Sequence, residues 1–111
     1  MKIGILRVGQ VDSHVMDRIQ ENLNMIFPKT TCALISETMP IPSEAFNNAR
    51  QQYRSNIILS RVHSYAEKDK ALDRVLGTVN VDIFVPELNF VFGEAECPGK
   101  AALISLWRLR P

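Results

Sequence analysis

The feature that most constrains the fold is a nearly continuous apolar run close to the end of the sequence, Ala101–Leu109. A strand that is apolar on both of its sides needs cover on both. This pattern is typical of a strand inside a parallel sheet that has helices on each face. We therefore predict that the run forms a strand in such a sheet. It is far too short to cross a membrane as a helix, which takes about 20 apolar residues.

Four further segments have the β-branched and apolar residues of strands, and two have the apolar spacing of helices. The predicted strands are Lys2–Val8, Thr31–Glu37, Val79–Val85 and Asn89–Ala95, and the predicted helices are Val11–Phe27 and Ser55–Ala66. Apolar residues recur every three or four positions in the first helix and form one stripe. Asp12 or Ser13 can cap that helix, and Ser55 is the expected cap of the second.

The connections between these segments indicate how the strands are arranged. Two prolines at the start of Met39–Arg50 favour an extended connection, which we expect to pack on the surface. Leu72, Val75 and Leu76 predict a further helical turn that ends at Gly77. Helices between the early strands imply parallel pairing, whereas the short link between the third and fourth predicted strands implies an antiparallel hairpin.

Together these elements predict a mixed α/β fold. We expect a mostly parallel, twisted sheet of five strands, two long helices and one antiparallel strand at an edge of the sheet. A length of 111 residues is typical of one domain. We therefore expect residues 1–111 to form a single domain.

Charge and cysteine content exclude several classes of function. Thirteen basic residues oppose twelve acidic ones, for a net charge of +1. Such a balance argues against a nucleic-acid surface or a polybasic membrane anchor. Arg7 interrupts the apolar N-terminus before a signal-peptide core forms, so we expect no export signal. Two cysteines cannot build a disulfide scaffold, and we expect a cytoplasmic protein without nucleic-acid or membrane partners.

The residues that carry chemistry do not form a complete site in the sequence. Gly9 follows the first predicted strand, but no glycine-rich phosphate-binding motif surrounds it. His63 and Glu67 lie four apart on one helix face, where we expect a weak exposed charge pair rather than a metal site. Whether His63, Glu67 or Cys97 takes up adventitious metal stays open at this point.

Glu94 and Glu96 are expected on the same face of the fourth predicted strand. Paired carboxylates carry out acid–base catalysis in many enzymes. A glutamate pair on an edge strand, however, more often keeps that edge soluble. The residues alone therefore predict a fold without a competent active site.

Several segments, taken in order along the chain, carry a resemblance to a known family. They are Met39-Pro40-Ile41-Pro42, Arg50-Gln51-Gln52-Tyr53, Leu76–Ala95 and the run Ala101–Leu106. The most specific string is Asn89-Phe90-Val91-Phe92-Gly93, which composition alone does not explain. In these segments the sequence resembles the archaemetzincins, and the resemblance extends over essentially the whole chain.

Archaemetzincins are zinc-dependent metallopeptidases of the metzincin group, and the resemblance implies the N-terminal subdomain of that fold. There, the antiparallel fourth strand lies at the sheet edge and lines the substrate cleft. The resemblance implies that a peptide substrate adds to this edge, along Asn89, Phe90, Val91, Phe92, Gly93 and Glu94. Because residues two apart share one face of a strand, we expect Phe90 and Phe92 to lie together in the core.

The sequence departs from the family at the catalytic site. The zinc motif of the metzincins is His-Glu-x-x-His-x-x-Gly-x-x-His, on a helix that follows the fifth strand. This sequence ends at Pro111, just after that strand, and no residue in it matches the zinc ligands, the catalytic glutamate or the Met-turn. We therefore expect no catalytic and no metal-binding residue in this chain, and zinc only in the full-length family.

Two functions remain open from the sequence. The chain is expected to be the N-terminal scaffold of an archaemetzincin-like metallopeptidase, inactive by itself. The alternative is a non-enzymatic interaction module that associates through an exposed sheet edge or face. Apolar surface left uncovered beside Ala101–Leu106 would favour a homo-oligomer.

Overall fold

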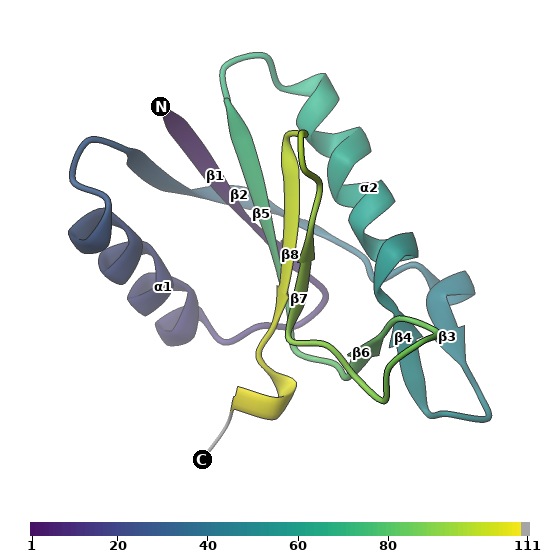
Figure 1. The fold of residues 1–111 in the computed structure, drawn as a ribbon. Helices are drawn as coiled ribbons and strands as arrows, with labels where there is room; N and C mark the ends of the chain where they lie inside the picture. The colour runs from purple at the N-terminus through teal and green to yellow at the C-terminus, as the bar shows by residue number, and fades with distance from the viewer. Residues whose placement is uncertain (110–111) are drawn as a thin grey trace.

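The computed structural model describes residues 1–109, and residues 110–111 at the end of the expected domain lie outside the described residues. The elements are shown in Figure 1. In chain order they are β1 (Lys2–Val8), α1 (Ser13–Ile26), β2 (Thr31–Met39), the 3-10 turn η1 (Ser43–Ala45), β3 (Phe46–Asn47), β4 (Gln52–Arg54), α2 (Ser55–Lys68), β5 (Arg74–Val79), β6 (Ile83–Phe84), β7 (Gly93–Ala95), β8 (Ala101–Ser105) and the 3-10 turn η2 (Trp107–Leu109).

The described residues form a main sheet of five strands in the order β2-β1-β5-β8-β7. All neighbours in it are parallel except β7 and β8, which are antiparallel. A smaller sheet, β3-β4-β6, lies beside the start of α2 (Figure 1). The expected fold class is confirmed: a mixed, mostly parallel five-stranded sheet with two helices and an antiparallel edge strand.

The two helices lie on opposite faces of the main sheet (Figure 1). α1 packs on β2 and β1, and its buried Met16 meets Ile5 and Cys32 there. α2 packs on β8, β5 and β7, and its buried Ile58 and Val62 join the larger core of the molecule. Each helix therefore covers a different half of the sheet as well as a different face.

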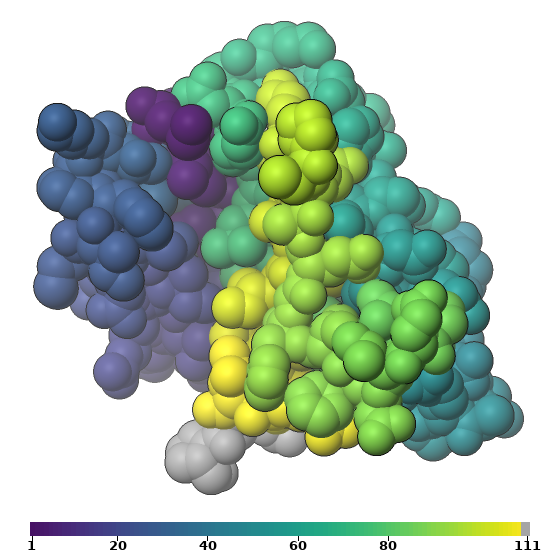
Figure 2. Space-filling view, viewed as in Figure 1, coloured from purple at the N-terminus to yellow at the C-terminus, as the bar shows by residue number. Residues whose placement is uncertain are grey.

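Because the helices are offset, β8 is covered unequally. Its side chains that face α2, from Ala101, Leu103 and Ser105, are each 3% exposed or less. Ala102 and Ile104 point to the other face and are only half-buried. Together with Leu76 and Ala95, which the register places on the same face, they form what we call the open face. A pocket of about 350 Å³ lies there between α1 and the last two strands of the sheet, and Figure 2 shows the hollow beside α1.

Helix α1 begins close to the position predicted. Asp12 is its N-cap, and Asp12 Oδ1 accepts hydrogen bonds from the backbone N–H of His14 and Val15. Ser55 was expected to cap α2, and this is wrong: Arg54 precedes the helix, and no side chain caps it. Ser55 is instead the fully buried first residue of α2, and its hydroxyl is directed at the edge strand β7.

The predicted helical turn that ends at Gly77 is also wrong, because this segment is the central strand β5. Val75 and Val79 are buried there between β1 and β8. A Cβ atom at Gly77 would lie 2.7 Å from Cγ2 of Val62. The glycine therefore permits the close approach of α2 to the sheet rather than ending a helix.

The predicted strand Val79–Val85 does not exist as one element. β5 ends at Val79, and only Ile83–Phe84 is a strand, paired with β4 in the smaller sheet. Two contacts account for the break. Ser105 Oγ donates to the carbonyl of Val81, and the N–H of Tyr53 donates to the carbonyl of Asp82.

Two other segments differ from the prediction: one has more regular structure than expected, and the other is a shorter strand. The connection Met39–Arg50, expected to be extended throughout, contains η1 and β3. The strand expected at Ala101–Leu109 ends at Ser105, and η2 follows. In residues 1–109, neither helix is long and apolar enough to span a membrane.

Candidate peptide-binding edge

β7 is the last strand of the main sheet, and within residues 1–109 no strand pairs with its outer edge. The N–H of Ser105 donates to the carbonyl of Phe92, and the N–H of Glu96 donates to the carbonyl of Ala101. Along an antiparallel strand, the backbone N–H and C=O groups of one residue bond the neighbouring strand, and those of the next residue are directed away from it. Residues 92, 94 and 96 therefore face β8, whereas the backbone groups of Gly93 and Ala95 are directed outward. Figure 2 shows β7 and the segment before it on the surface.

The strand is shorter than the predicted Asn89–Ala95, since only Gly93–Ala95 is β-structure. The expected hairpin with the preceding strand is reduced to one isolated bridge, in which the N–H of Val91 donates to the carbonyl of Ile83 at 3.0 Å. That bond turns the segment before Gly93 toward the smaller sheet. The antiparallel partner of β7 is instead β8.

Gly93 allows β7 to lie close to β8. A Cβ atom at this position would be 2.5 Å from the carbonyl oxygen of Leu103, which is closer than real Cβ contacts. The obstacle is backbone, so a side chain at position 93 could be accommodated only by moving the strand. The free edge therefore begins at a residue that the packing requires to be glycine.

Glu94 joins the edge strand to helix α2. Its Oε1 accepts a hydrogen bond of 2.5 Å from the hydroxyl of Ser55, the first residue of the helix. The carboxylate thus lies at the N-terminal end of α2, where the helix dipole favours negative charge. Glu94 is half-buried, so this contact positions the strand rather than offering a free acid to a substrate.

Glu96, just after β7, makes a second contact with the same helix. Its Oε1 lies 2.9 Å from Nδ1 of His63 and also accepts a bond from the N–H of Ala101. The hydrogen bond to Glu96 raises the pKa of His63, and the same bond lowers the pKa of Glu96. Glu67 lies 3.6 Å from Nε2 of His63, as the weak exposed pair expected from the sequence.

These residues do not fit a metal. Glu96 and Glu67 contact opposite nitrogens of the His63 ring, so the three groups do not converge on one point. Cys97 is exposed, and Cys32 is buried in β2. Within the described residues, no group of three or more His, Cys, Asp or Glu side chains is placed to hold a metal ion. The zinc that the family resemblance implies therefore has no ligand set in this part of the chain.

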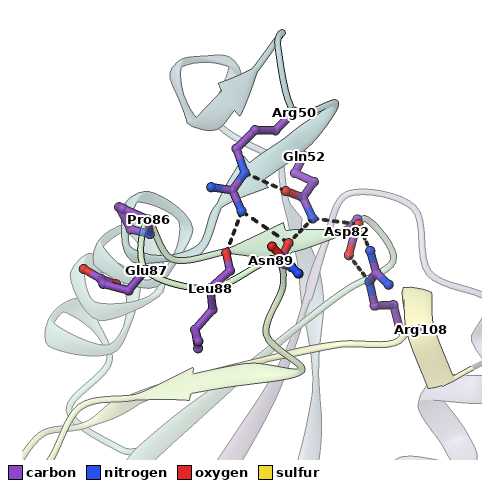
Figure 3. Close-up of a pocket in the computed structure, with 8 residues that line it drawn as sticks. All are labelled: Arg50, Gln52, Asp82, Pro86, Glu87, Leu88, Asn89 and Arg108. Carbon is purple, nitrogen blue, oxygen red and sulfur yellow. Dashed lines mark hydrogen bonds and ion pairs between the residues drawn. The ribbon is translucent and has the colours of Figure 1, made fainter.

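Asn89 lies in a polar pocket of about 420 Å³ rather than on the edge strand (Figure 3). Its carbonyl accepts hydrogen bonds from the side chains of Gln52, at 2.8 Å, and Arg50, at 3.3 Å. Arg50 also donates to the carbonyl of Leu88 at 2.6 Å, and its guanidinium lies 3.9 Å from the centre of the Phe84 ring. These bonds fix the path of the chain that leads into β7.

On the other side of this pocket, Asp82 and Arg108 form a two-point ion pair (Figure 3). Arg108 Nε and Nη2 donate to the two carboxylate oxygens at 2.7 and 2.8 Å. Gln52 donates to the same carboxylate. The bonds from Arg108 hold the pKa of Asp82 below its usual value. The pair joins the residue just before β6 to η2.

Phe90 and Phe92 share one side of the chain as predicted, but their expected burial in the core is wrong. Phe92 is 50% exposed, and Phe90 is half-buried. Their rings meet edge to face, with centroids 5.3 Å apart and an interplanar angle of 85°. The core below this region is already filled by Ile83 and Phe84, which are buried.

The residues of the polar pocket were not predicted as site residues. Arg50, Gln52, Asp82 and Arg108 come from separate parts of the chain and meet only in the fold. Arg50 and Gln52 are within a string that carries the family resemblance, which was one signal for them. Asp82 interrupts an apolar segment, which is unusual for a strand and would have indicated a bend.

The fold and the edge define a class of protein: a mixed α/β protein with an open antiparallel strand at the end of its sheet. No family model matches the sequence. Curated relatives do. The archaemetzincin of Methanocaldococcus jannaschii is 40% identical over 111 residues, which are 100% of this chain and 57% of the relative. The archaemetzincin of Methanopyrus kandleri is 32% identical over 97 residues, 87% of this chain and 53% of the relative.

Solved structures agree with this relationship. The crystal structure of the archaemetzincin from Archaeoglobus fulgidus, complexed with malonate, matches with a TM-score of 0.81 and 31% identity, over 100% of this chain and 64% of that one. The Methanopyrus kandleri archaemetzincin matches with a TM-score of 0.73, also at 31% identity, over 100% and 61%. The chain belongs to the archaemetzincins, and it spans just over half the length of the curated relatives it matches.

Proposed function

We propose that this chain is the scaffold of an archaemetzincin-type zinc metallopeptidase and that it binds the peptide substrate along the outer edge of β7. The observation that carries the proposal is the unpaired backbone of Gly93 and Ala95, directed away from β8. The similarity to archaemetzincins supports it, since the structure from Archaeoglobus fulgidus matches over the whole of this chain. The substrate class is therefore a peptide or a protein segment in extended conformation.

Strand addition would use two residues of the edge. An extended peptide offers N–H and C=O groups at alternate positions, and these can pair with the outward groups of Gly93 and Ala95. Val91 is already bonded to Ile83, so the peptide would leave the edge at about Phe92. Asn89 and Phe90 would then shape the surroundings of the peptide rather than bond its backbone, while Glu94 holds the edge in place.

The experiment is a titration of the 111-residue chain, labelled with ¹⁵N, with a terminally blocked five-residue peptide of high strand propensity. We expect the amide signals of Gly93 and Ala95 to shift most. The amide of Glu94, which faces β8, is the internal control and should shift less. Equal shifts at all three residues, or none, would contradict binding along this edge.

We also propose that the 111-residue chain hydrolyses no peptide bond by itself. The described residues lack a ligand set for zinc, and the carboxylates of Glu94 and Glu96 are bound to Ser55 and His63. In the family the metal supplies the activation of water, and here this chain would contribute only the binding and orientation of the peptide. Purified chain incubated with zinc should retain no stoichiometric metal and show no turnover. Tight zinc with turnover would overturn this part of the proposal.

A second function is favoured by the open face. Leu76, Ala102 and Ile104 are half-buried there, beside the pocket of about 350 Å³. A second copy of the chain could cover these apolar side chains, which would make the chain an interaction module that self-associates. Sedimentation over a wide concentration range tests this: a dimer that Ile104→Asp dissociates is expected. A monomer at all concentrations would rule it out.

The cellular setting is part of the same proposal. Cys32 and Cys97 are both free in the structure, one buried and the other exposed. Free thiols are typical of a reducing compartment, so we propose a cytoplasmic protein, which acts on peptides rather than on nucleic acid or membranes. We further propose that residues 1–111 form one domain. A single unfolding transition, seen alike by circular dichroism and by Trp107 fluorescence, is the expected result.

A further inference from the structure

Phe92 is an apolar side chain at the start of the free edge, and half of its surface is exposed. It directly precedes Gly93, the first residue whose backbone is directed outward. One side of its ring meets the ring of Phe90 at 5.3 Å, edge to face. The other side faces solvent. Large exposed aromatic side chains next to unpaired strand backbone are suited to contact a bound segment.

Phe90 is held firmly enough to support Phe92. The guanidinium of Arg108 lies 3.9 Å from the centre of the Phe90 ring. Arg108 is itself fixed by its two bonds to Asp82, and Asp82 accepts a further bond of 2.9 Å from Gln52. The stack of Arg108, Phe90 and Phe92 is thus anchored in the polar pocket. Its free end, Phe92, is the part that a ligand can reach.

The register of the edge determines what would lie beside Phe92. A peptide that runs antiparallel to β7 and bonds Gly93 and Ala95 would place its next residue directly opposite Phe92. Opposite residues of an antiparallel pair have Cβ atoms roughly 5 Å apart and on the same face. That peptide side chain would therefore pack against the exposed half of the Phe92 ring.

We propose that Phe92 is a specificity-determining residue, which selects peptides with a large apolar side chain, above all an aromatic one, at the position opposite it. The proposal rests on the proposed binding of peptides along β7 and adds the kind of side chain preferred. An aromatic ring would extend the stack and be removed from water. A polar side chain of the same length would lose part of its hydration without gaining a hydrogen-bond partner.

The experiment compares two terminally blocked five-residue peptides, which differ only in a phenylalanine or asparagine at the fourth position. That position lies opposite Phe92 when the first and third residues lie opposite Ala95 and Gly93. Dissociation constants for the 111-residue chain are measured from amide shifts at Gly93 and Ala95. We expect the phenylalanine peptide to bind about three- to tenfold more tightly, the usual range for an aromatic pair. Equal affinity with clear shifts at the edge would overturn the selectivity of Phe92 and leave edge binding intact. No shift with either peptide would overturn both.

Variants locate the preference. Phe92→Ala should bind both peptides equally, whereas Phe92→Leu should keep part of the preference because it retains an apolar surface. Met25→Ala removes another exposed apolar side chain, on α1 and away from the edge, and should keep the full preference. A preference that survives in Phe92→Ala would overturn the proposal. The comparison of the two peptides on the unaltered chain remains decisive if a variant does not fold.

Discussion

Leu103 and Ile104 are neighbours on β8, yet they meet different surroundings. Leu103 is buried under α2, together with Val62 and Val75. Ile104 points to the open face, on the side of the sheet where α1 packs mainly on β2 and β1, and is only half-buried. The side chains of β8 are thus fully buried on the face toward α2 and only partly buried on the open face. The apolar run of β8 is suited to burial on both faces, and the described residues bury it on one face only.

The largest expected effect on stability comes from truncating a side chain on the buried face of β8. Leu103→Ala should lower the free energy of unfolding by about 2–5 kcal/mol, because it leaves a cavity under α2. Ile104→Ala should cost about half of that or less, since much of the side chain is already in contact with water. Urea unfolding of both variants measures the two losses. Equal losses of unfolding free energy in the two variants would contradict this difference, because they would show that the two faces of β8 are packed alike.

A smaller effect is expected where β7 meets β8. Gly93→Ala places a methyl group against the carbonyl of Leu103, and the strand must move to admit it. We expect a loss of about 1–3 kcal/mol, the usual cost of overpacking. Hydrogen exchange should quicken at the amide of Glu94. Amides between β1 and β5 serve as the internal control and should keep their protection relative to global unfolding; uniform loss across the sheet would contradict a local effect.

The smallest expected effect concerns pH. His63 has a pKa raised above its ordinary 6.5, so its stabilising contact with Glu96 is complete below that pH and is lost as pH rises through the raised value. Glu96 has a pKa lowered below 4.5, so its contribution is present above that pH and is lost as pH falls through the lowered value. The contact should therefore be strongest between pH 4.5 and 6.5.

Two variants test this window. In His63→Gln, the decline of the unfolding midpoint between about pH 6 and 8 should be flatter than in the unaltered chain. Glu96→Gln should flatten the same interval, and the double variant should add little to either, because both remove one interaction. If the unfolding midpoint depends on pH in both single variants as it does in the unaltered chain, the contact between His63 and Glu96 does not help to hold β7 against α2.

Local signals predicted the parts of the fold that depend on local rules. Lys2–Val8 is the strand that its β-branched residues indicated, and Asp12 caps the helix that follows it. The apolar spacing around Gly77 predicts a helical turn, but the same spacing suits a buried strand. In the fold this segment pairs with β1 on one side and with β8 on the other, two strands that are distant from each other in the sequence.

The site was only partly predictable for the same reason. The family resemblance located the edge strand, and its Gly93–Ala95 portion is confirmed as the antiparallel edge. Its upstream half is bent away by contacts with Arg50 and Gln52, which no spacing rule connects to it. Phe92 was expected in the core on general grounds of aromatic burial. Its exposure depends on a core already filled from other segments.

The two glutamates beside β7 have a consequence for how that strand is aligned. Glu94 is bound at the first residue of α2 and Glu96 at His63, two turns further along. A slip of one residue in a strand turns every side chain to the opposite face, so it would carry both carboxylates away from the helix at once. The alignment of this short, exposed strand is thus set by polar anchors rather than by apolar burial. The two glutamates, which resemble a pair of catalytic acids in the sequence, thus fix the register of β7 and keep the backbone groups of Gly93 and Ala95 directed outward.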